Sequence, residues 1–247
     1  MNRIDNYEKL RNDIVKWISD YAIENPPIKS LVVGVSGGID SAVVSTLAAS
    51  TGLPTYVLGM PIHQNYEQES LSDAHLEWLK SNFKNVIAHK FDLTKVFETF
   101  KFTMKELGSN THALANTRSR LRMVTLYQVA TSVNGIVVGT GNKVEDYGVG
   151  FYTKYGDGGV DIAPIADLYK TEVWELGKFL GVNPEIINAS PTDGLWDDGR
   201  TDEDQIGASY AELEEAMETG SGPGLEALIK FSQMNQHKMN PIPTFKL

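Results

Sequence analysis

The sequence predicts an α/β fold, a doubly wound parallel sheet with helices on both of its faces. Short β-branched runs alternate along the chain with longer stretches in which apolar residues recur at helical spacing. Each succession of strand, helix and strand implies a right-handed crossover between parallel strands, which covers both faces of the sheet with helices. Ligands in such sheets bind beyond the carboxyl ends of the strands, so the segments after Val35, Gly59 and Thr140 are expected to form the site.

The first half of the chain supplies most of the regular elements. Apolar residues between Leu10 and Tyr21 recur on one face of a predicted helix over 5–24, which the NPP segment at 25–27 ends. The predicted strands lie at 30–35, 55–59, 85–90 and 135–140. The further helices are predicted at 39–50, 66–82, 94–108 and 112–132.

Beyond the last strand the pattern is less regular. A polar loop rich in Gly and Asp is expected over 141–164, followed by a helix that Asp167 caps and whose apolar face runs from Val173 to Leu180. One further helix is marked by Ile206, Tyr210, Leu213 and Met217. A last short helix follows the turn at 219–224, and the tail from His237 is expected to be irregular.

Composition limits the classes of function. The 247 residues suit one sizeable domain or two small ones. The absence of cysteine excludes disulfides, thiolate zinc sites and thiol nucleophiles, and it fits a cytoplasmic protein. A formal charge of −10 argues against general nucleic-acid binding, since phosphate contacts need clustered Lys and Arg. The sequence contains no apolar run that approaches the length of a membrane span, and its first residues lack the apolar core of a signal peptide.

The segment LVVGVSGGIDSAVV, residues 31–44, indicates an anion site. It has the pattern of a strand, a Gly- and Ser-rich turn and a helix, and the N–H groups and dipole at such a helix start attract phosphate. No lysine follows the glycines as in the GxxxxGK[ST] loop, so the turn is better suited to holding a pyrophosphate that leaves. Asp40 would repel phosphate unless it faces a metal ion, and Mg²⁺ between them converts the repulsion into two attractions. A tight turn with Asp40 as a cap is the alternative.

SGGIDS matches the SGGxDS pyrophosphate loop of the N-type ATP pyrophosphatases, which adenylate a substrate and release pyrophosphate. Three further segments resemble the NAD synthetase family: NTRSRLRMVTLY (116–127), VVGTGNKVED (137–146) and VGFYTKYGDGGVDIAPIADLYKTEVWEL (149–176). The likeness runs from about residue 8 to residue 245. It implies an adenine nucleotide alpha hydrolase-like fold and a single synthetase domain over 1–247.

The same resemblance implies a reaction, ATP-dependent amidation of deamido-NAD to NAD with Mg²⁺. The substrate carboxylate attacks the α-phosphorus of ATP, pyrophosphate leaves, and ammonia displaces AMP from the NAD-adenylate. Amidating enzymes that use glutamine commonly carry a cysteine nucleophile, and this chain has no cysteine, so free ammonia is the expected nitrogen source. Because the family is dimeric, we expect a homodimer with the dinucleotide site near the subunit interface.

The resemblance also implies residue roles. Asp40, Lys170 and Asp157 are the implied catalytic residues, and Asp157 would hold ammonium or accept its proton. Asp40 and Glu145 are the implied Mg²⁺ ligands; one residue more than in many relatives separates Glu145 from the FYTKYGDGG block, so Asp146 is the alternative ligand. The implied ATP site comprises Gly34, Ser36, Gly37, Gly38, Ile39, Asp40, Ser41, Arg122, Thr140, Lys170 and Thr192. The implied deamido-NAD site comprises Asn116, Arg120, Lys154, Asp157, Asp161, His237 and Lys238, of which the last two also resemble elements that close over ATP.

The residues alone leave structural alternatives open. Thr140 could serve only as a strand-end cap, and Lys170 could extend into solvent. Helical spacing puts Arg118 and Arg122 on one face and Arg120 on another, so two basic faces could bind phosphates, or all three could pair with acidic residues of the chain. Turn chemistry alone explains the GDGG segment, and a solvated acidic loop explains the carboxylates at 145–146.

Two other functions compete with this interpretation. One is a different ATP pyrophosphatase, such as the amidating domain of GMP synthetase or a tRNA thiolase, although thiolases typically use cysteine persulfide chemistry. The other is a nonenzymatic adenine-nucleotide-binding module, which has no evident need for paired carboxylates or for SGGIDS. The long KYGDGGVD segment argues against the first class.

Overall fold

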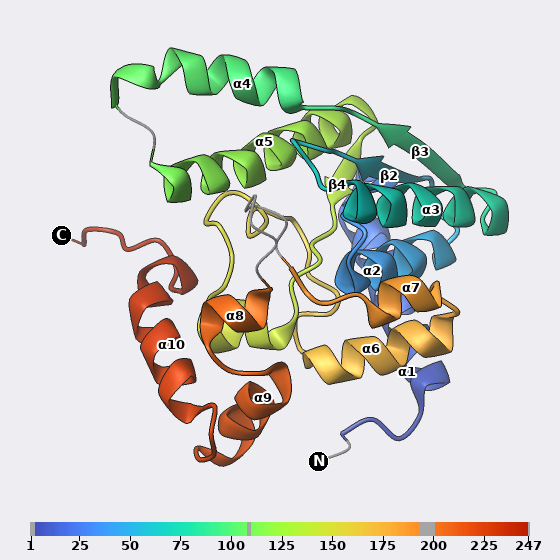
Figure 1. The fold of residues 1–247 in the computed structure, drawn as a ribbon. Helices are drawn as coiled ribbons and strands as arrows, with labels where there is room; N and C mark the ends of the chain where they lie inside the picture. The colour runs from blue at the N-terminus through green and yellow to red at the C-terminus, as the bar shows by residue number, and fades with distance from the viewer. Residues whose placement is uncertain (1–2, 108–109, 193–200, 247) are drawn as a thin grey trace.

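The computed structural model describes residues 3–107, 110–192 and 201–246. Four strands form one parallel sheet in the order β3-β2-β1-β4 (Figure 1). They are β1 (Ser30–Gly34), β2 (Thr55–Gly59), β3 (Val86–Lys90) and β4 (Gly135–Val137). In the centre of the sheet, Leu31 of β1 is in register with Thr55 of β2 and Ile136 of β4. All four predicted strands are present, and β4 ends three residues earlier than predicted. Val138 still donates to the Val32 carbonyl of β1 (2.9 Å), but Gly139 donates to the Ile162 carbonyl (2.7 Å).

The described part of the chain contains ten α-helices. They are α1 (Tyr7–Glu24), α2 (Ile39–Ser50), α3 (Tyr66–Asn82), α4 (Thr94–Thr103), α5 (Thr111–Ser132), α6 (Lys170–Leu180), α7 (Pro184–Asn188), α8 (Asp202–Ile206), α9 (Tyr210–Thr219) and α10 (Leu225–Met239). A 3-10 turn, η1 (Lys105–Leu107), follows α4, and a π-helix, η2 (Val144–Val149), follows β4. No helix in the described ranges is long and apolar enough to cross a membrane.

Helices cover both faces of the sheet, as the sequence predicts. Leu31 and Val33 of β1 point to one face, where they pack in a core with α1, α2 and α6. Val32 between them points to the other face and joins a core with Phe97 of α4 and Ala130 of α5. Figure 1 shows α4 and α5 on one side of the strands, with α2 and α6 on the opposite side. The prediction of a doubly wound parallel sheet is therefore confirmed.

The strand order positions a ligand site. β2 and β3 lie on one side of β1, and β4 lies on the other, so the connections that leave β1 and β4 diverge from adjacent carboxyl ends. A crevice opens at such a switch point, because neighbouring crossovers run to opposite faces. The SGGIDS turn leaves β1 here, and the segment with Thr140 and Glu145 leaves β4.

Three predictions about the C-terminal half are wrong. Asp167 does not cap α6, which begins at Lys170; Tyr169 is the cap, its N–H donates to Glu172 (2.8 Å), and Asp167 pairs with Lys143 (2.8 Å). The helix expected from Ile206 to Met217 is broken at Gly207, whose φ of +84° ends α8 before α9 begins. The last helix is not short, because α10 continues through His237 and Lys238 to Met239.

The segment 141–164, predicted to be a polar loop, contains the helical segment η2. Its polar residues gave no pattern that predicts a helix. η2 packs its Val144 and Val149 against Tyr210 and Leu213 of α9 in a separate apolar cluster. A π-helix takes more residues per turn than an α-helix, and it occurs mostly as a single turn that is frequently found at functional sites. η2 contains residues 146–149, which lie between Glu145 and the FYTKYGDGG block, and it lies beside the crevice.

Candidate active site

The SGGIDS turn forms a compact, self-bonded connection between β1 and α2. The Ser41 hydroxyl accepts from the Ser36 N–H (3.1 Å) and donates to the Gly38 carbonyl (2.9 Å). Gly37 has φ +91°, and a Cβ there would collide with the backbone of α3 at Gln68. Gly38 caps α2 without any side-chain acceptor for the first helical N–H groups. The start of this helix of 12 residues is therefore suited to an anion.

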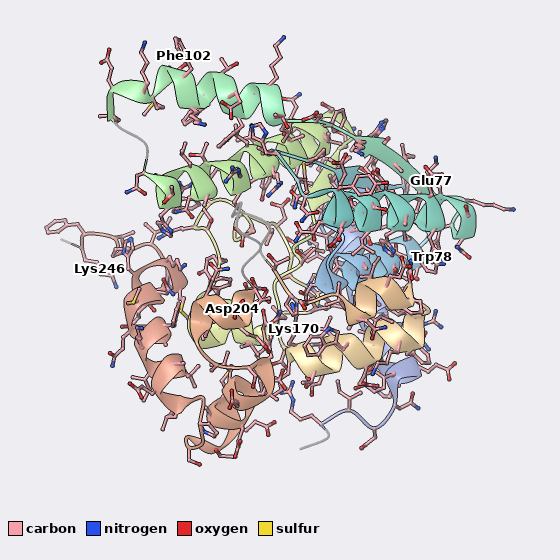
Figure 2. All side chains as sticks on the ribbon, viewed as in Figure 1. Glu77, Trp78, Phe102, Lys170, Asp204 and Lys246 are labelled. Atoms are coloured by element: carbon pink, nitrogen blue, oxygen red, sulfur yellow. The ribbon has the colours of Figure 1, made fainter. Side chains whose placement is uncertain are left out.

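Three charged side chains from three elements meet beside this turn. Lys170, at the start of α6, forms ion pairs with Asp40 of α2 and with Glu145 of η2 (3.0 Å to Oε1). The Lys170 side chain is only 4% exposed, so it does not extend into solvent. Figure 2 labels Lys170 near the centre of the molecule, where α6 begins. The arrangement brings together side chains that are 25 and 130 residues apart in sequence.

Burial and the pairing of charges act against each other in this cluster. Burial would lower the pKa of Lys170, but Asp40 and Glu145 raise it above its ordinary value, so the ammonium stays charged. Burial raises the pKa of Asp40, and the adjacent Lys170 opposes that rise. A lysine in the first turn of a helix opposes the helix dipole, and the two carboxylates compensate for this.

The structure distinguishes the two acidic neighbours in η2. Glu145 contacts Lys170 beside Asp40, whereas Asp146 packs against Gly141, where a Cβ would overlap its carboxylate. Burial raises the pKa of Asp146 to about 7, and the negative charges of Glu145 and Asp157 add to this. Geometry therefore pairs Asp40 with Glu145.

The donor set fits Mg²⁺ held together with a nucleotide. Asp40 and Glu145 supply hard oxygen donors, and both contact the same cationic group, the Lys170 ammonium. The described residues contain no group of three or more His, Cys, Asp or Glu side chains that could hold a metal ion unaided. Mg²⁺ is commonly bound by one or two carboxylates plus substrate phosphates, and Asp40 and Glu145 would supply the two carboxylates.

A cavity of about 290 Å³ lies at the carboxyl ends of β1, β2 and β4. Every residue of the predicted ATP set lines it, from Gly34 and the SGGIDS turn to Arg122, Thr140, Lys170 and Thr192. Glu145, Asp146 and Asp157 line it as well. Residues that were grouped by resemblance are thus neighbours in space around one cavity.

The predicted deamido-NAD residues, apart from Asp157, lie outside the lining of this cavity. Most of them gather around the glycine-rich segment between α5 and α10. Arg120 donates to the Lys154 carbonyl (3.3 Å), and the Asn116 side chain accepts from the Thr153 hydroxyl (2.6 Å). Lys238 on α10 donates to the Tyr152 carbonyl (2.6 Å). His237, in the same turn of α10, is exposed.

Two aspartates of the glycine-rich segment are already engaged within the chain. Asp157 Oδ1 accepts from the Ser119 hydroxyl (2.6 Å) and the Thr153 N–H (3.0 Å). Burial raises the pKa of Asp157, and the Ser119 hydrogen bond opposes the rise. Asp161 accepts from the Val137 N–H (2.7 Å) and the Tyr127 hydroxyl (3.1 Å), which fixes the segment to β4 and α5.

The three arginines of α5 have three different neighbours. Arg118 is buried with its guanidinium over the Phe97 ring of α4 (4.8 Å to the centroid). Arg122 donates to the Met60 carbonyl (3.0 Å) at the cavity. Helical spacing predicts that Arg118 and Arg122 lie on one face of the helix. It does not predict that, of the three arginines, Arg122 alone lines the cavity.

The comparison with protein families decides the membership of the chain. The family model described as NAD synthase matches residues 10–245. The chain belongs to the NAD synthase family. The resemblance expected from the sequence is confirmed.

Individual NAD synthases and related structures agree with this membership. The NH(3)-dependent NAD(+) synthetase of Carboxydothermus hydrogenoformans is 37% identical, over 94% of this chain and 95% of the relative. A structure described as NMN synthetase from Francisella tularensis superposes with a TM-score of 0.90, at 34% identity over 99% of this chain and all of that one. The NH3-dependent NAD synthetase from Campylobacter jejuni has a TM-score of 0.79 at 25% identity, over 98% of this chain and all of that one.

Two residues of the candidate site were not predicted from the sequence. Asn142 is fully buried; its side-chain oxygen accepts from the Glu145 N–H (3.1 Å) and its amide donates to Asp40 (3.4 Å). The hydroxyl of Tyr210, for which the sequence predicts only a place on the apolar face of a helix, donates to Glu145 (2.7 Å). An Asn just before a helical turn is a capping signal that could have marked Asn142. The contact of Tyr210 has no local signal, because 65 residues separate it from Glu145.

Proposed function

We propose that the chain is a carbon–nitrogen ligase that amidates deamido-NAD to NAD with ATP and ammonia. The observation that carries this proposal is the cluster of Lys170, Asp40 and Glu145 beside the SGGIDS turn, within the cavity that all predicted ATP residues line. The names of NAD synthase relatives, NH(3)-dependent NAD(+) synthetase, support it. Residues 1–247 act as one synthetase domain in this proposal.

The first half-reaction is adenylation of the substrate. The SGGIDS turn and the start of α2 bind the phosphates of ATP, and Lys170 supplies a positive charge beside them. Asp40 and Glu145 would hold Mg²⁺, which neutralises phosphate charge when bound. The nicotinate carboxylate forms a bond to the α-phosphorus while the bond from that phosphorus to the pyrophosphate oxygen breaks. The products are an acyl adenylate and pyrophosphate.

The second half-reaction forms the amide. Ammonia attacks the carbonyl carbon of the adenylate, AMP leaves with the electron pair of the carbon–oxygen bond, and one proton is lost from nitrogen. Asp157 is the proposed residue that holds ammonium or accepts this proton. It lines the cavity, and burial raises its pKa, a direction that favours proton uptake.

Assembly and location complete the proposal. We propose a homodimer, because apolar side chains gather in exposed positions on α4 and the turn after it: Val96, Phe100, Phe102 and Leu107. Figure 2 labels Phe102 on the outer side of α4. Large exposed apolar side chains within one short segment are typical of surfaces that bind another protein chain. We also propose a cytoplasmic location, which a composition without cysteine fits.

A second candidate is amidation of nicotinic acid mononucleotide to NMN. The structure described as NMN synthetase has a higher TM-score and identity to this chain than the C. jejuni NAD synthetase. The reacting carboxylate is the same in both acids. The cluster of Lys170, Asp40 and Glu145, here called the adenylating cluster, would therefore serve either acid. The two substrates differ only by the adenylyl half, which residues outside the ATP cavity, such as Arg120 and Lys154, would have to recognise.

One experiment tests both candidates. The purified chain is incubated with ATP, Mg²⁺ and ammonium chloride, together with either the acid dinucleotide or the acid mononucleotide, and amide and pyrophosphate are quantified. Amide formation with a higher kcat/KM for the dinucleotide supports the first candidate, and the opposite ratio supports the second. Pyrophosphate release that is independent of both acids would contradict both.

A further inference from the structure

Tyr210, the first residue of α9, contacts two members of the adenylating cluster at once. Its side chain is 1% exposed. Its hydroxyl lies 2.7 Å from Glu145 Oε1 and 3.2 Å from Asp202 Oδ2. The Lys170 ammonium lies over its ring, 4.9 Å from the centroid. One tyrosine therefore contacts both the carboxylate and the ammonium of an ion pair that comes from η2 and α6.

The chemistry of a phenol suits this position. The ordinary pKa of a tyrosine hydroxyl, about 10, lies well above neutral pH, so the hydroxyl keeps its proton and remains a donor. The electron-rich face of its ring attracts the Lys170 ammonium. Trp174 of α6 packs edge-on against the same ring (6.1 Å between centroids) and limits its rotation. The ring is thus held with its hydroxyl oxygen within reach of both Glu145 and Asp202.

A second contact ties α9 to the same site. Glu214 lies one helical turn after Tyr210 and accepts from both the N–H (3.0 Å) and the hydroxyl (2.6 Å) of Thr171. Thr171 follows Lys170 in the first turn of α6. Because residues four apart share a helix face, α9 presents Tyr210 and Glu214 together to the cluster and to the start of α6.

We infer that Tyr210 is a positioning residue, whose hydroxyl orients the Glu145 carboxylate beside Asp40 for binding of the metal–nucleotide complex. This inference rests on the proposed function. Tyr210 touches Glu145 and Lys170 rather than the reacting atoms, so it acts through them. Groups that hydrogen-bond to metal-ligating carboxylates typically contribute about 10–100-fold to metal affinity.

Tyr210→Phe tests the role of the hydroxyl, because it keeps the ring, its contact with Trp174 and the surface under Lys170. Mn²⁺ serves as the probe, in the presence of a non-hydrolysable ATP analogue, and free Mn²⁺ is measured by electron paramagnetic resonance. We expect the Kd for Mn²⁺ to rise about tenfold in Tyr210→Phe. The Mg²⁺ concentration for half-maximal NAD formation should rise in parallel, while kcat at saturating Mg²⁺ returns to near the wild-type value.

Tyr147→Phe is the matched control. Tyr147 lies in η2, two residues from Glu145, but it is 67% exposed. Its loss of a hydroxyl should leave Mn²⁺ binding unchanged. Circular dichroism and the thermal midpoint report whether either variant is misfolded, a change that would also lower kcat at saturating Mg²⁺.

A double mutant shows whether Tyr210 acts through Glu145. In a Glu145→Gln background, Tyr210→Phe should have little further effect on the Kd for Mn²⁺, since the carboxylate that it orients is gone. An equal loss in both backgrounds, or an unchanged Kd in Tyr210→Phe itself, overturns the inference. A wild-type chain that binds Mn²⁺ with the analogue but forms no amide contradicts the proposed function and leaves the inference standing.

Discussion

The ammonium group of Lys170 lies in a place that is unfavourable for a cation in two respects. Its ammonium is buried and lies at the positive end of the α6 dipole, and both placements disfavour a cation. Asp40 and Glu145 outweigh them, since two carboxylates and one ammonium leave the cluster with a net charge of −1. A cluster of this sign attracts a divalent cation, and release of Lys170 from either carboxylate would direct its charge toward phosphate.

Replacement of Asp40 tests its proposed role as a metal ligand. Asp40→Asn should lower pyrophosphate release about 100-fold or more, because a metal ligand supports several kcal/mol of charge stabilisation. The fold should persist, since Lys170 keeps its ion pair with Glu145. The measurement is pyrophosphate release at saturating ATP and Mg²⁺. Asp167→Asn, which removes an exposed partner of Lys143, is the control and should retain full activity. Near-wild-type turnover of Asp40→Asn would refute the metal role.

Glu145 and Asp146 can be separated by the same type of measurement. Glu145→Gln should raise the Mg²⁺ concentration for half-maximal activity about tenfold or more, because Glu145 lies beside Asp40 on Lys170. Asp146→Asn should change this concentration much less, since Asp146 packs against Gly141 instead. The opposite order would show that Asp146 is the ligand.

The strands and helices that the sequence predicts correctly are those with a local apolar pattern. Strands and helices up to residue 140 appear close to their predicted bounds, because each has an apolar face or run of its own. The exception is the helix predicted over 94–108, since α4 ends at Thr103 and η1 follows it. η2 was missed because its polar sequence has the composition of a loop, and its helical form depends on packing against α9. Likewise, SGGIDS is a contiguous motif that could be recognised, whereas the contact of Tyr210 with Glu145 is created only by the tertiary fold.

The contact between α2 and α3 should make stability depend on pH. His75 of α3 is buried, stacks on Trp78 and bonds to Ser45 of α2 (3.0 Å). Burial lowers its pKa to about 4, below the value of about 6.5 expected in the unfolded chain. The unfolded state therefore binds more protons between these values, and stability is lost as the pH falls from about 6.5 toward about 4.

His75→Gln measures this contribution. Between pH 7.5 and pH 5, the unfolding free energy of the wild type should fall by about 2 kcal/mol more than that of the variant. Denaturant unfolding at both pH values provides the two differences. Equal losses in the two proteins would mean that His75 already takes up a proton in the folded state. The comparison uses differences within each protein, so the loss of packing in His75→Gln cancels.

The exposed apolar side chains of α4 predict a dimer. Phe102 is 69% exposed and Leu107 is 80% exposed, which is unfavourable for a monomer in water. Light scattering should give twice the mass of one chain. Phe102→Glu combined with Val96→Glu should shift the mass toward that of a monomer, and Tyr66→Glu on α3, an exposed position on another element, should not. A monomeric wild type at micromolar concentration would refute the dimer.

The nitrogen source is a second property of the whole chain. None of its 247 residues is a cysteine, the usual nucleophile for releasing ammonia from glutamine, so ammonium chloride should support amide formation and ammonia-free glutamine should not.

The attacking species must be neutral NH₃, while ammonium, with a pKa of roughly 9, dominates at pH 7. Activity at a fixed, subsaturating total ammonium concentration should therefore rise from pH 7 toward about 8.5–9, by as much as about tenfold for each pH unit below that pKa. Initial rates across this range, replotted against the concentration of NH₃, should collapse onto one curve. Rates that follow total ammonium instead would favour the role of Asp157 in holding the ammonium cation, whose proton is then removed in the site. Comparable amide yield from glutamine would refute the use of free ammonia.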